Sequence, residues 1–238
     1  MRPALKAGLR PLWRDRDTLQ IGVDPRRAIA LTGLGKAAAV VALLDGSRDT
    51  AGVEHAAREY GIPVEATRVV LSLLADAGVL DDFPATLHRS LPAQLRARLG
   101  PDLACASLAA GHSDGGEGTF ARRRAGAVRV YGAGRVGACV ATLLAASGVA
   151  RVSCRDSGIA GYADLSPGGL SRDDVGVPRS AAAARAIRRA APEARLTEDM
   201  TRQPDLAVLA GPADPEEVAG LLQVPSQLTI MACLVPGC

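Results

Sequence analysis

The fold is decided by residues 127–156, which read AVRVYGAGRVGACVATLLAASGVARVSCRD. Residues 127–131 form a short, mostly apolar run that predicts a strand. A G-x-G-x-x-G turn follows from Gly132 to Gly137, and an Ala- and Leu-rich segment after it predicts a helix that ends near Gly148. The last residues read as a second strand that ends on an acid. This order predicts a βαβ unit.

The glycine spacing indicates a nucleotide site. In such a turn Gly132 permits the tight bend, Gly134 lets a phosphate approach the backbone, and Gly137 allows close packing of the helix on the strand. The helix N-terminus then offers free N–H groups to an anion. Asp156 follows Gly137 by 19 residues, close to the roughly 20-residue offset of a ribose-binding acid. The alternative is a merely structural glycine turn, with Asp156 as a strand-end cap.

Beyond this unit, helical and extended segments alternate. Residues 180–191 and 215–222 predict helices, and residues 194–197, 205–210 and 228–232 predict strands. Alternation of this kind is typical of an α/β fold with a Rossmann-like, mostly parallel sheet.

The first 82 residues predict a separate, winged-helix-like α+β domain. Alternating segments at Leu19–Val23 and Ala28–Leu31 flank turn residues and predict a β-hairpin. Three helices are expected after it, at about 36–44, 50–60 and 64–77. Residues 83–126 then predict a linker with a helical piece near 92–99 and a flexible part near 111–118, before a domain at 127–238.

Composition narrows the functional classes. The net charge of +3 gives no basic excess for nucleic acid, and no apolar run reaches the roughly 18 residues of a membrane span. The N-terminus lacks the apolar centre of a signal peptide, and the five scattered cysteines form no C-x-x-C pair, so a cytoplasmic protein without a metal site is expected. Residues 127–238 contain no His and no Lys, which disfavours hydride-transfer chemistry.

Four segments resemble the ThiF/MoeB group of adenylating enzymes, which are related to ubiquitin-activating proteins. They are 132–137, 147–156, 174–180 and 205–209, within a resemblance that covers about residues 127–232. The resemblance implies ATP with magnesium as the cofactor. The nucleotide-binding positions that it implies are Gly132, Gly134, Gly137, Asp156 and Arg179.

Departures from the family pattern predict that adenylation activity is degenerate. Pro167 stands where the family has a phosphate-contacting arginine, and Arg179 stands where it has a lysine. The expected magnesium-binding Asp is replaced by Ala213, with Asp214 one place further on. Arg179 and Asp214 are therefore the candidate catalytic residues. Loss of such positioned charges weakens transition-state stabilisation.

The C-terminal segment also departs from the family pattern. Cys233 and Cys238 supply two of the four ligands of a structural zinc site, so we expect no zinc and a shortened C-terminus.

Residues 1–82 resemble the winged-helix peptide-recognition module of ThiF-like proteins in azoline-peptide pathways. That resemblance implies two partners, a substrate or leader peptide and a modifying enzyme. The resemblance to adenylating enzymes adds a homodimer as a further expectation. The leading hypothesis is that the peptide adds a strand near Leu19–Val23 or Ala28–Leu31 and is presented to the modifying enzyme.

Two alternatives remain open. One is an active ATP-dependent adenylyltransferase of carboxylates, in which Arg135, Arg172 or Arg179 serves the phosphates and Asp214 the magnesium. The other is a winged-helix DNA-binding regulator with a nucleotide-sensing domain. Helix 64–77 carries a single basic residue, Arg68, which disfavours a nucleic-acid partner.

Overall fold

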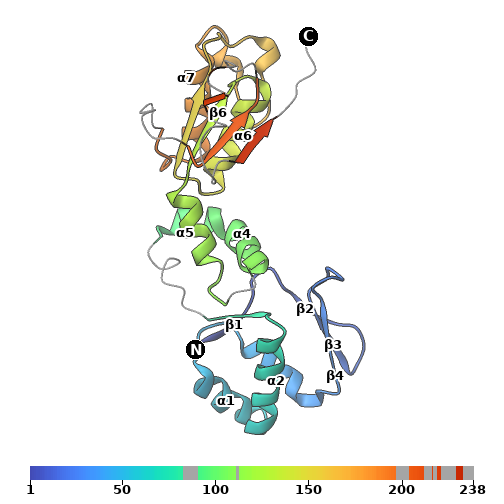
Figure 1. The fold of residues 1–238 in the computed structure, drawn as a ribbon. Helices are drawn as coiled ribbons and strands as arrows, with labels where there is room; N and C mark the ends of the chain where they lie inside the picture. Colours follow the sequence, from blue (N-terminus) through green and yellow to red (C-terminus); the bar gives the residue numbers. More distant parts are fainter. Residues whose placement is uncertain are drawn as a thin grey trace. The chain divides into compact units, whose positions relative to one another are not determined.

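The computed structural model describes residues 1–82, 91–110, 113–196, 204–211, 216, 219, 220 and 229–232. The chain forms two compact units, Met1–Phe120 and Ala121–Cys238 (Figure 1). Within the described ranges no helix is long and apolar enough to cross a lipid bilayer.

Unit 1 contains two small antiparallel sheets and several helices. One sheet pairs β1 (Pro3–Leu5) with β5 (Leu80–Asp82). The other has the order β2-β3-β4, with β2 at Pro11–Trp13, β3 at Thr18–Ile21 and β4 at Ile29–Thr32. The predicted hairpin is therefore confirmed as β3 and β4, and the structure adds β2 to it.

The helices predicted for the first 82 residues are present. Their bounds are η1 Gly35–Leu43, α1 Thr50–Glu59 and α2 Val64–Asp76. The first of them has 3-10 hydrogen bonding, and no side chain caps its N-terminus. The second begins where Asp49 accepts a hydrogen bond from the Gly52 N–H at 2.8 Å, which is ordinary N-cap geometry.

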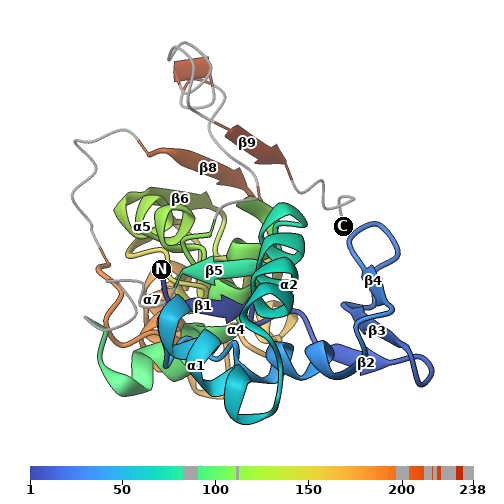
Figure 2. The same cartoon turned by 90° about the horizontal axis from the view of Figure 1, so that it is seen from below.

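Apolar side chains from these elements form one core. The strand β3 contributes Ile21, while Val40, Val53 and Leu74 come from η1, α1 and α2 in turn, and all four are essentially inaccessible to solvent. Burial of such side chains is the main stabilising term for a unit of this size. Both views show the three-stranded sheet beside these helices (Figures 1 and 2).

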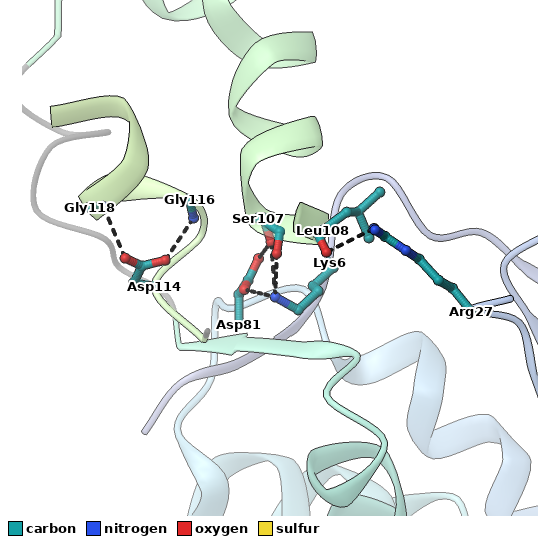
Figure 3. Close-up of polar contacts among 8 residues, drawn as sticks. All are labelled: Lys6, Arg27, Asp81, Ser107, Leu108, Asp114, Gly116 and Gly118. Carbon is teal, nitrogen blue, oxygen red and sulfur yellow. Dashed lines mark hydrogen bonds and ion pairs between the residues drawn. The ribbon is translucent and has the colours of Figure 1, made fainter. Parts of the chain in front are cut away.

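The segment expected to be a linker contains two helices, α4 (Ala93–Ala110) and α5 (Glu117–Ala125). The predicted helical piece near 92–99 is the start of α4. Before α5, Asp114 accepts hydrogen bonds from the N–H groups of Gly116 and Gly118 (Figure 3). The domain boundaries proposed from the sequence remain a prediction.

A buried polar cluster joins α4 to the small sheet of unit 1. The Lys6 ammonium lies 3.0 Å from Asp81 Oδ1 and donates to the Ser107 carbonyl oxygen at 2.9 Å (Figure 3). The Ser107 hydroxyl donates to Asp81 Oδ2 at 2.7 Å. Lys6 is only 3% exposed, so its charge depends on these partners.

Unit 2 is built on a parallel sheet with the strand order β7-β6-β8-β9. The strands are β6 Ala127–Tyr131, β7 Arg151–Arg155, β8 Leu206–Leu209 and β9 Thr229–Ala232. The helices α6 (Arg135–Ala146) and α7 (Arg179–Ala190) pack against these strands through small apolar side chains. The predicted α/β class, the βαβ unit and the strand at 228–232 are confirmed.

Two predicted elements of unit 2 are not seen as expected. The strand predicted at 194–197 is reduced to one bridge between Arg151 and Arg195, and Thr197 lies outside the described residues. The predicted helix at 215–222 also falls mostly outside them.

Between β7 and α7 the chain forms two short turns, η2 (Tyr162–Asp164) and η3 (Arg172–Asp174). Asp174 is 1% exposed and accepts hydrogen bonds from Ser171 N and Oγ, both at 2.8 Å. Burial raises the pKa of the Asp174 carboxyl, but these bonds and the charges of Arg185 and Arg189 outweigh burial and lower it. The ionised carboxylate therefore holds the segment that leads into α7.

Candidate functional site

The predicted glycine turn joins the end of β6 to α6. Gly132 has a φ of 88°, and a Cβ built on it would lie 2.7 Å from the Gly211 nitrogen. A Cβ on Gly137 would lie 1.7 Å from the Gly132 carbonyl oxygen. Both positions therefore require glycine for backbone reasons. Their part in nucleotide binding stays a prediction.

Gly134 is the N-cap of α6 and lies beside a carboxylate that the sequence analysis did not single out. A Cβ on Gly134 would lie 3.0 Å from Asp164 Oδ1. The N-terminus of a helix attracts anions, and in a nucleotide-binding turn a phosphate occupies this position. Here the carboxylate of Asp164 lies close to that N-terminus.

Asp156 holds the glycine turn in shape. Its Oδ2 accepts a hydrogen bond from the Ala133 N–H at 2.7 Å, and its Oδ1 accepts one from the Gly158 N–H at 2.7 Å. Each carboxylate oxygen keeps a further lone pair that a ribose hydroxyl could use. The predicted ribose-binding role stays open, and the bracing role is what the geometry shows.

Arg179, the first residue of α7, is held by two carboxylates. Its Nε donates to Asp164 Oδ2 at 2.9 Å, and its Nη1 lies 3.8 Å from Asp156 Oδ2. Asp164 also accepts the Gly161 N–H at 2.8 Å. Both carboxylates are nearly buried, whereas the arginine side chain is 34% exposed. The guanidinium is thus already neutralised by groups of the chain.

Two other predicted charges, Arg135 and Arg172, do not bond to this cluster. Both residues are exposed, and their side chains have no hydrogen bond or ion pair within the described part of the chain. Asp214 lies outside that part, so the structure says nothing of it. Among the residues that can be examined, no group of three or more His, Cys, Asp or Glu side chains could hold a metal ion.

Cys154, on β7, lines a cavity of about 340 Å³ between β7 and α7. Burial raises the pKa of its thiol to about 12, and the charge of Asp156 adds to this effect. The thiol is therefore protonated at neutral pH and is no nucleophile in this state.

These residues meet only part of what ATP requires. The glycine turn and Asp156 are present as the predicted nucleoside site requires, with Asp156 bonded to the turn. Beside the N-terminus of α6, however, lies the Asp164 carboxylate, which would repel a phosphate bound there, and Arg179 is engaged with this carboxylate. A triphosphate does not fit this charge distribution, so we derive no reaction step through it.

Asp164 could have been found in the sequence. It is the first residue of Asp164-Leu165-Ser166-Pro167-Gly168, where the resembled family has N-L-N-R-Q. Relative to that pattern, the segment loses an arginine at Pro167 and gains a negative charge three residues earlier, at Asp164.

A second candidate site is the three-stranded sheet of unit 1. The expectation that Leu19–Val23 forms a free edge is wrong, because β3 pairs with β2 on one side and with β4 on the other. A strand that is bonded on both sides has no backbone groups left for a peptide. The expected segment Ala28–Leu31 overlaps β4, which is an edge strand.

The register shows which backbone groups of β4 face outward. The Thr18 carbonyl oxygen accepts a hydrogen bond from the Arg14 N–H, on the β2 side. Because successive residues of a strand bond to opposite sides, the backbone groups of the next residue, Leu19, bond toward β4. Leu19 lies opposite Leu31. This alternation leaves the N–H and C=O groups of Ala30 and Thr32 on the outer side, where an added strand could bond to them.

Comparisons with known proteins agree with this fold. The chain is similar to the structure of E. coli MccB with AMPCPP and MccA, with a TM-score of 0.66, 15% identity and coverage of 88% of this chain and 61% of that one. For E. coli MccB with ATP the TM-score is 0.66 and the identity 15%, with coverage of 89% of this chain and 62% of that one. For the Microcin C7 biosynthetic enzyme MccB with N-formylated MccA the TM-score is 0.63 and the identity 15%, with coverage of 88% of this chain and 60% of that one.

The chain spans about three fifths of the length of these MccB chains, and at this identity the likeness concerns the fold. No curated protein matches the sequence. Residues 111–214 match the ThiF family. That range contains the glycine turn, Asp156, Asp164 and Arg179, and this part of the chain is a ThiF family domain.

Proposed function

We propose that this chain binds a substrate or leader peptide through unit 1 and presents it to a partner modifying enzyme in peptide natural-product biosynthesis, of the azoline-forming kind. The observation that carries the proposal is the outward-facing edge of β4, in a chain whose ThiF domain holds Arg179 in an ion pair with Asp164. The structural likeness to MccB, which has been solved with MccA, supports a peptide partner.

Strand addition would give the complex its affinity and its register. A peptide laid against β4 bonds to the backbone groups of Ala30 and Thr32, while its alternate side chains choose the partner. Ala30 is exposed, so nothing on that side chain blocks the approach of the peptide. We expect the complex to form in the cytoplasm, and a homodimer stays a prediction.

The ThiF domain, in this proposal, binds Mg·ATP weakly and does not adenylate. Adenylation needs positive charge on the transferring phosphates. Arg179 supplies such a charge only after it leaves Asp164, and the freed carboxylate would then repel the phosphates.

The edge of β4 is tested by replacing Ala30 with proline in the full-length chain. Proline removes the outward N–H and is tolerated at a sheet edge, so folding is expected to persist. Peptides selected from a phage-displayed library against the wild-type chain should bind Ala30→Pro at least about tenfold more weakly, because a strand-addition bond is lost. Fluorescence anisotropy with labelled peptides measures the change.

Ala30→Ser is the matched control, because serine keeps the N–H. It should bind the selected peptides like the wild type. Equal affinity of the peptides for the proline and serine variants, or a library from which no peptide is enriched, would show that this edge is not the binding site.

The second candidate is an active adenylyltransferase, which the preserved glycine turn and Asp156 favour. Exchange of labelled pyrophosphate into ATP in the presence of acceptor peptides would establish it. For the DNA-binding alternative we expect a negative result, because Arg68 of α2 is bonded to Glu54 at 2.8 Å and therefore is not presented to a DNA groove.

A further inference from the structure

A groove of about 420 Å³ lies on unit 1 between β2 and η1. We call it the β2–η1 groove. Its lining is mostly apolar and includes Pro11, Trp13 and Leu19 from the strands and Ala38, Ala39 and Ala42 from η1. Trp13 is 60% exposed, which is unusual for a residue with so much apolar surface.

The strand β2 beside this groove is the other edge of the three-stranded sheet. The Arg10 carbonyl oxygen accepts a hydrogen bond from the Gly22 N–H, and the Arg14 N–H donates to the Thr18 carbonyl oxygen, both at 3.0 Å. The backbone groups of Arg10 and Arg14 therefore bond toward β3. In an antiparallel pair the alternate residues point the other way. The C=O of Pro11 and both backbone groups of Trp13 therefore face outward, at the margin of the groove.

The two faces of β2 carry different chemistry. Pro11 and Trp13 share the face that lines the groove, whereas Leu12 lies on the opposite face and is 44% exposed. Arg10 and Arg14 flank Leu12 on that face. Both are exposed, and neither side chain has a hydrogen bond or ion pair to any residue that the structure describes.

The neighbouring acid Asp15 forms no ion pair with the side chain of either arginine within the described contacts. The Asp15 carboxylate accepts two backbone N–H groups of its own turn, both at 2.8 Å. These bonds, and to a smaller extent the charge of Arg14, hold the pKa of Asp15 below its usual value. The edge thus presents two exposed arginine side chains, without an ion pair, on either side of an apolar residue.

We propose that the β2 edge and its groove form a second peptide-binding site, separate from β4, for an extended segment with three apolar residues between two acidic ones. Two of the apolar side chains enter the groove opposite Pro11 and Trp13, and the third packs against Leu12. The acidic ends lie opposite Arg10 and Arg14, where cross-strand pairs of opposite charge are favourable.

A second copy of the chain suits this edge poorly. If two β2 strands paired antiparallel about Leu12, Arg10 of each copy would face Arg14 of the other, and like charges directly opposite each other are destabilising. Charge therefore favours an acidic peptide over self-association as the occupant.

The test uses Trp13, the only tryptophan of the chain, as the reporter. The full-length protein is titrated with acetyl-Glu-Leu-Val-Leu-Glu-amide and with the same peptide carrying Lys at both ends. The acidic peptide should shift the Trp13 emission to shorter wavelength, and the shift should saturate. The peptide concentration at half-saturation should be about tenfold lower for the acidic peptide than for the basic one. The double variant Arg10→Glu, Arg14→Glu should reverse this preference, and Arg10→Lys, Arg14→Lys should keep it.

Absence of an emission shift, or equal responses to the two peptides, would overturn the site. The Ala30→Pro variant should respond to the acidic peptide like the wild type, because β4 lies on the far side of the sheet. Failure here therefore leaves the proposed function standing, whereas loss of the response in Ala30→Pro would mean that the two edges are not separate sites.

Discussion

Replacing Gly137 with alanine is expected to lower the free energy of unfolding of unit 2 by about 3 kcal/mol, the upper end of the usual cost of overpacking. The added Cβ would lie 1.7 Å from the Gly132 carbonyl oxygen. Gly132 cannot retreat easily, because it has a positive φ and lies against the backbone of Gly211. In a helix with free space at this position, the change from glycine to alanine would stabilise the fold. The steric clash is therefore the reason that a loss of stability is expected here.

Urea unfolding followed by circular dichroism measures this effect, while Trp13 fluorescence reports on unit 1 and should not change. Gly161→Ala is the control near the same cluster, because its Cβ would meet only Asp164 Oδ2, at an ordinary 3.9 Å. Unchanged unfolding of the Gly137 variant would mean that α6 does not pack on the turn as described.

Replacing Asp81 with asparagine is expected to destabilise unit 1 by about 3 kcal/mol, because the buried Lys6 ammonium loses the charge that balances it. Asparagine has nearly the same shape and can still accept a hydrogen bond from Ser107. The loss of stability therefore measures the effect of removing the charge and not the effect of a cavity. The midpoint of urea unfolding, followed by Trp13 fluorescence, measures it.

Two further variants sharpen this test. Asp82→Asn removes the neighbouring carboxylate, which accepts only the Arg2 backbone N–H in the described contacts, and should have a much smaller effect. The double variant Lys6→Met, Asp81→Asn should recover much of the lost stability, because removing both charges leaves no unpaired ion. If Asp81→Asn unfolds like the wild type, the cluster does not anchor α4.

Much of unit 2 could be predicted from local sequence. The spacing of Gly132, Gly134 and Gly137 after a strand fixes a turn that few other folds require, and Asp156 follows at the expected distance. The partners of Arg179 could not be predicted in this way. A contact between residues 15 positions apart across two short turns leaves no periodic signal in the sequence.

Unit 1 shows the same limit at another scale. The hairpin was recognisable because its two strands alternate around a turn, but β2 is three residues long and contains a proline. Because β2 could not be predicted, β3 was expected to be an edge strand of the hairpin. The pairing of β1 with β5 and the position of Lys6 depend on residues about 75 apart, and the sequence around Lys6 gives no sign that this lysine is buried.

Calorimetric titration of the full-length chain with Mg·ATP tests the central claim most directly, with the Asp164→Asn variant alongside. We expect weak binding by the wild type and binding at least about tenfold tighter by Asp164→Asn, because a negative charge beside the N-terminus of α6 is removed and Arg179 is released. Asp173→Asn, the same change at an exposed carboxylate, should behave like the wild type. Tight binding by the wild type that Asp164→Asn does not improve would contradict the claim that the chain's own ion pair closes its nucleotide site.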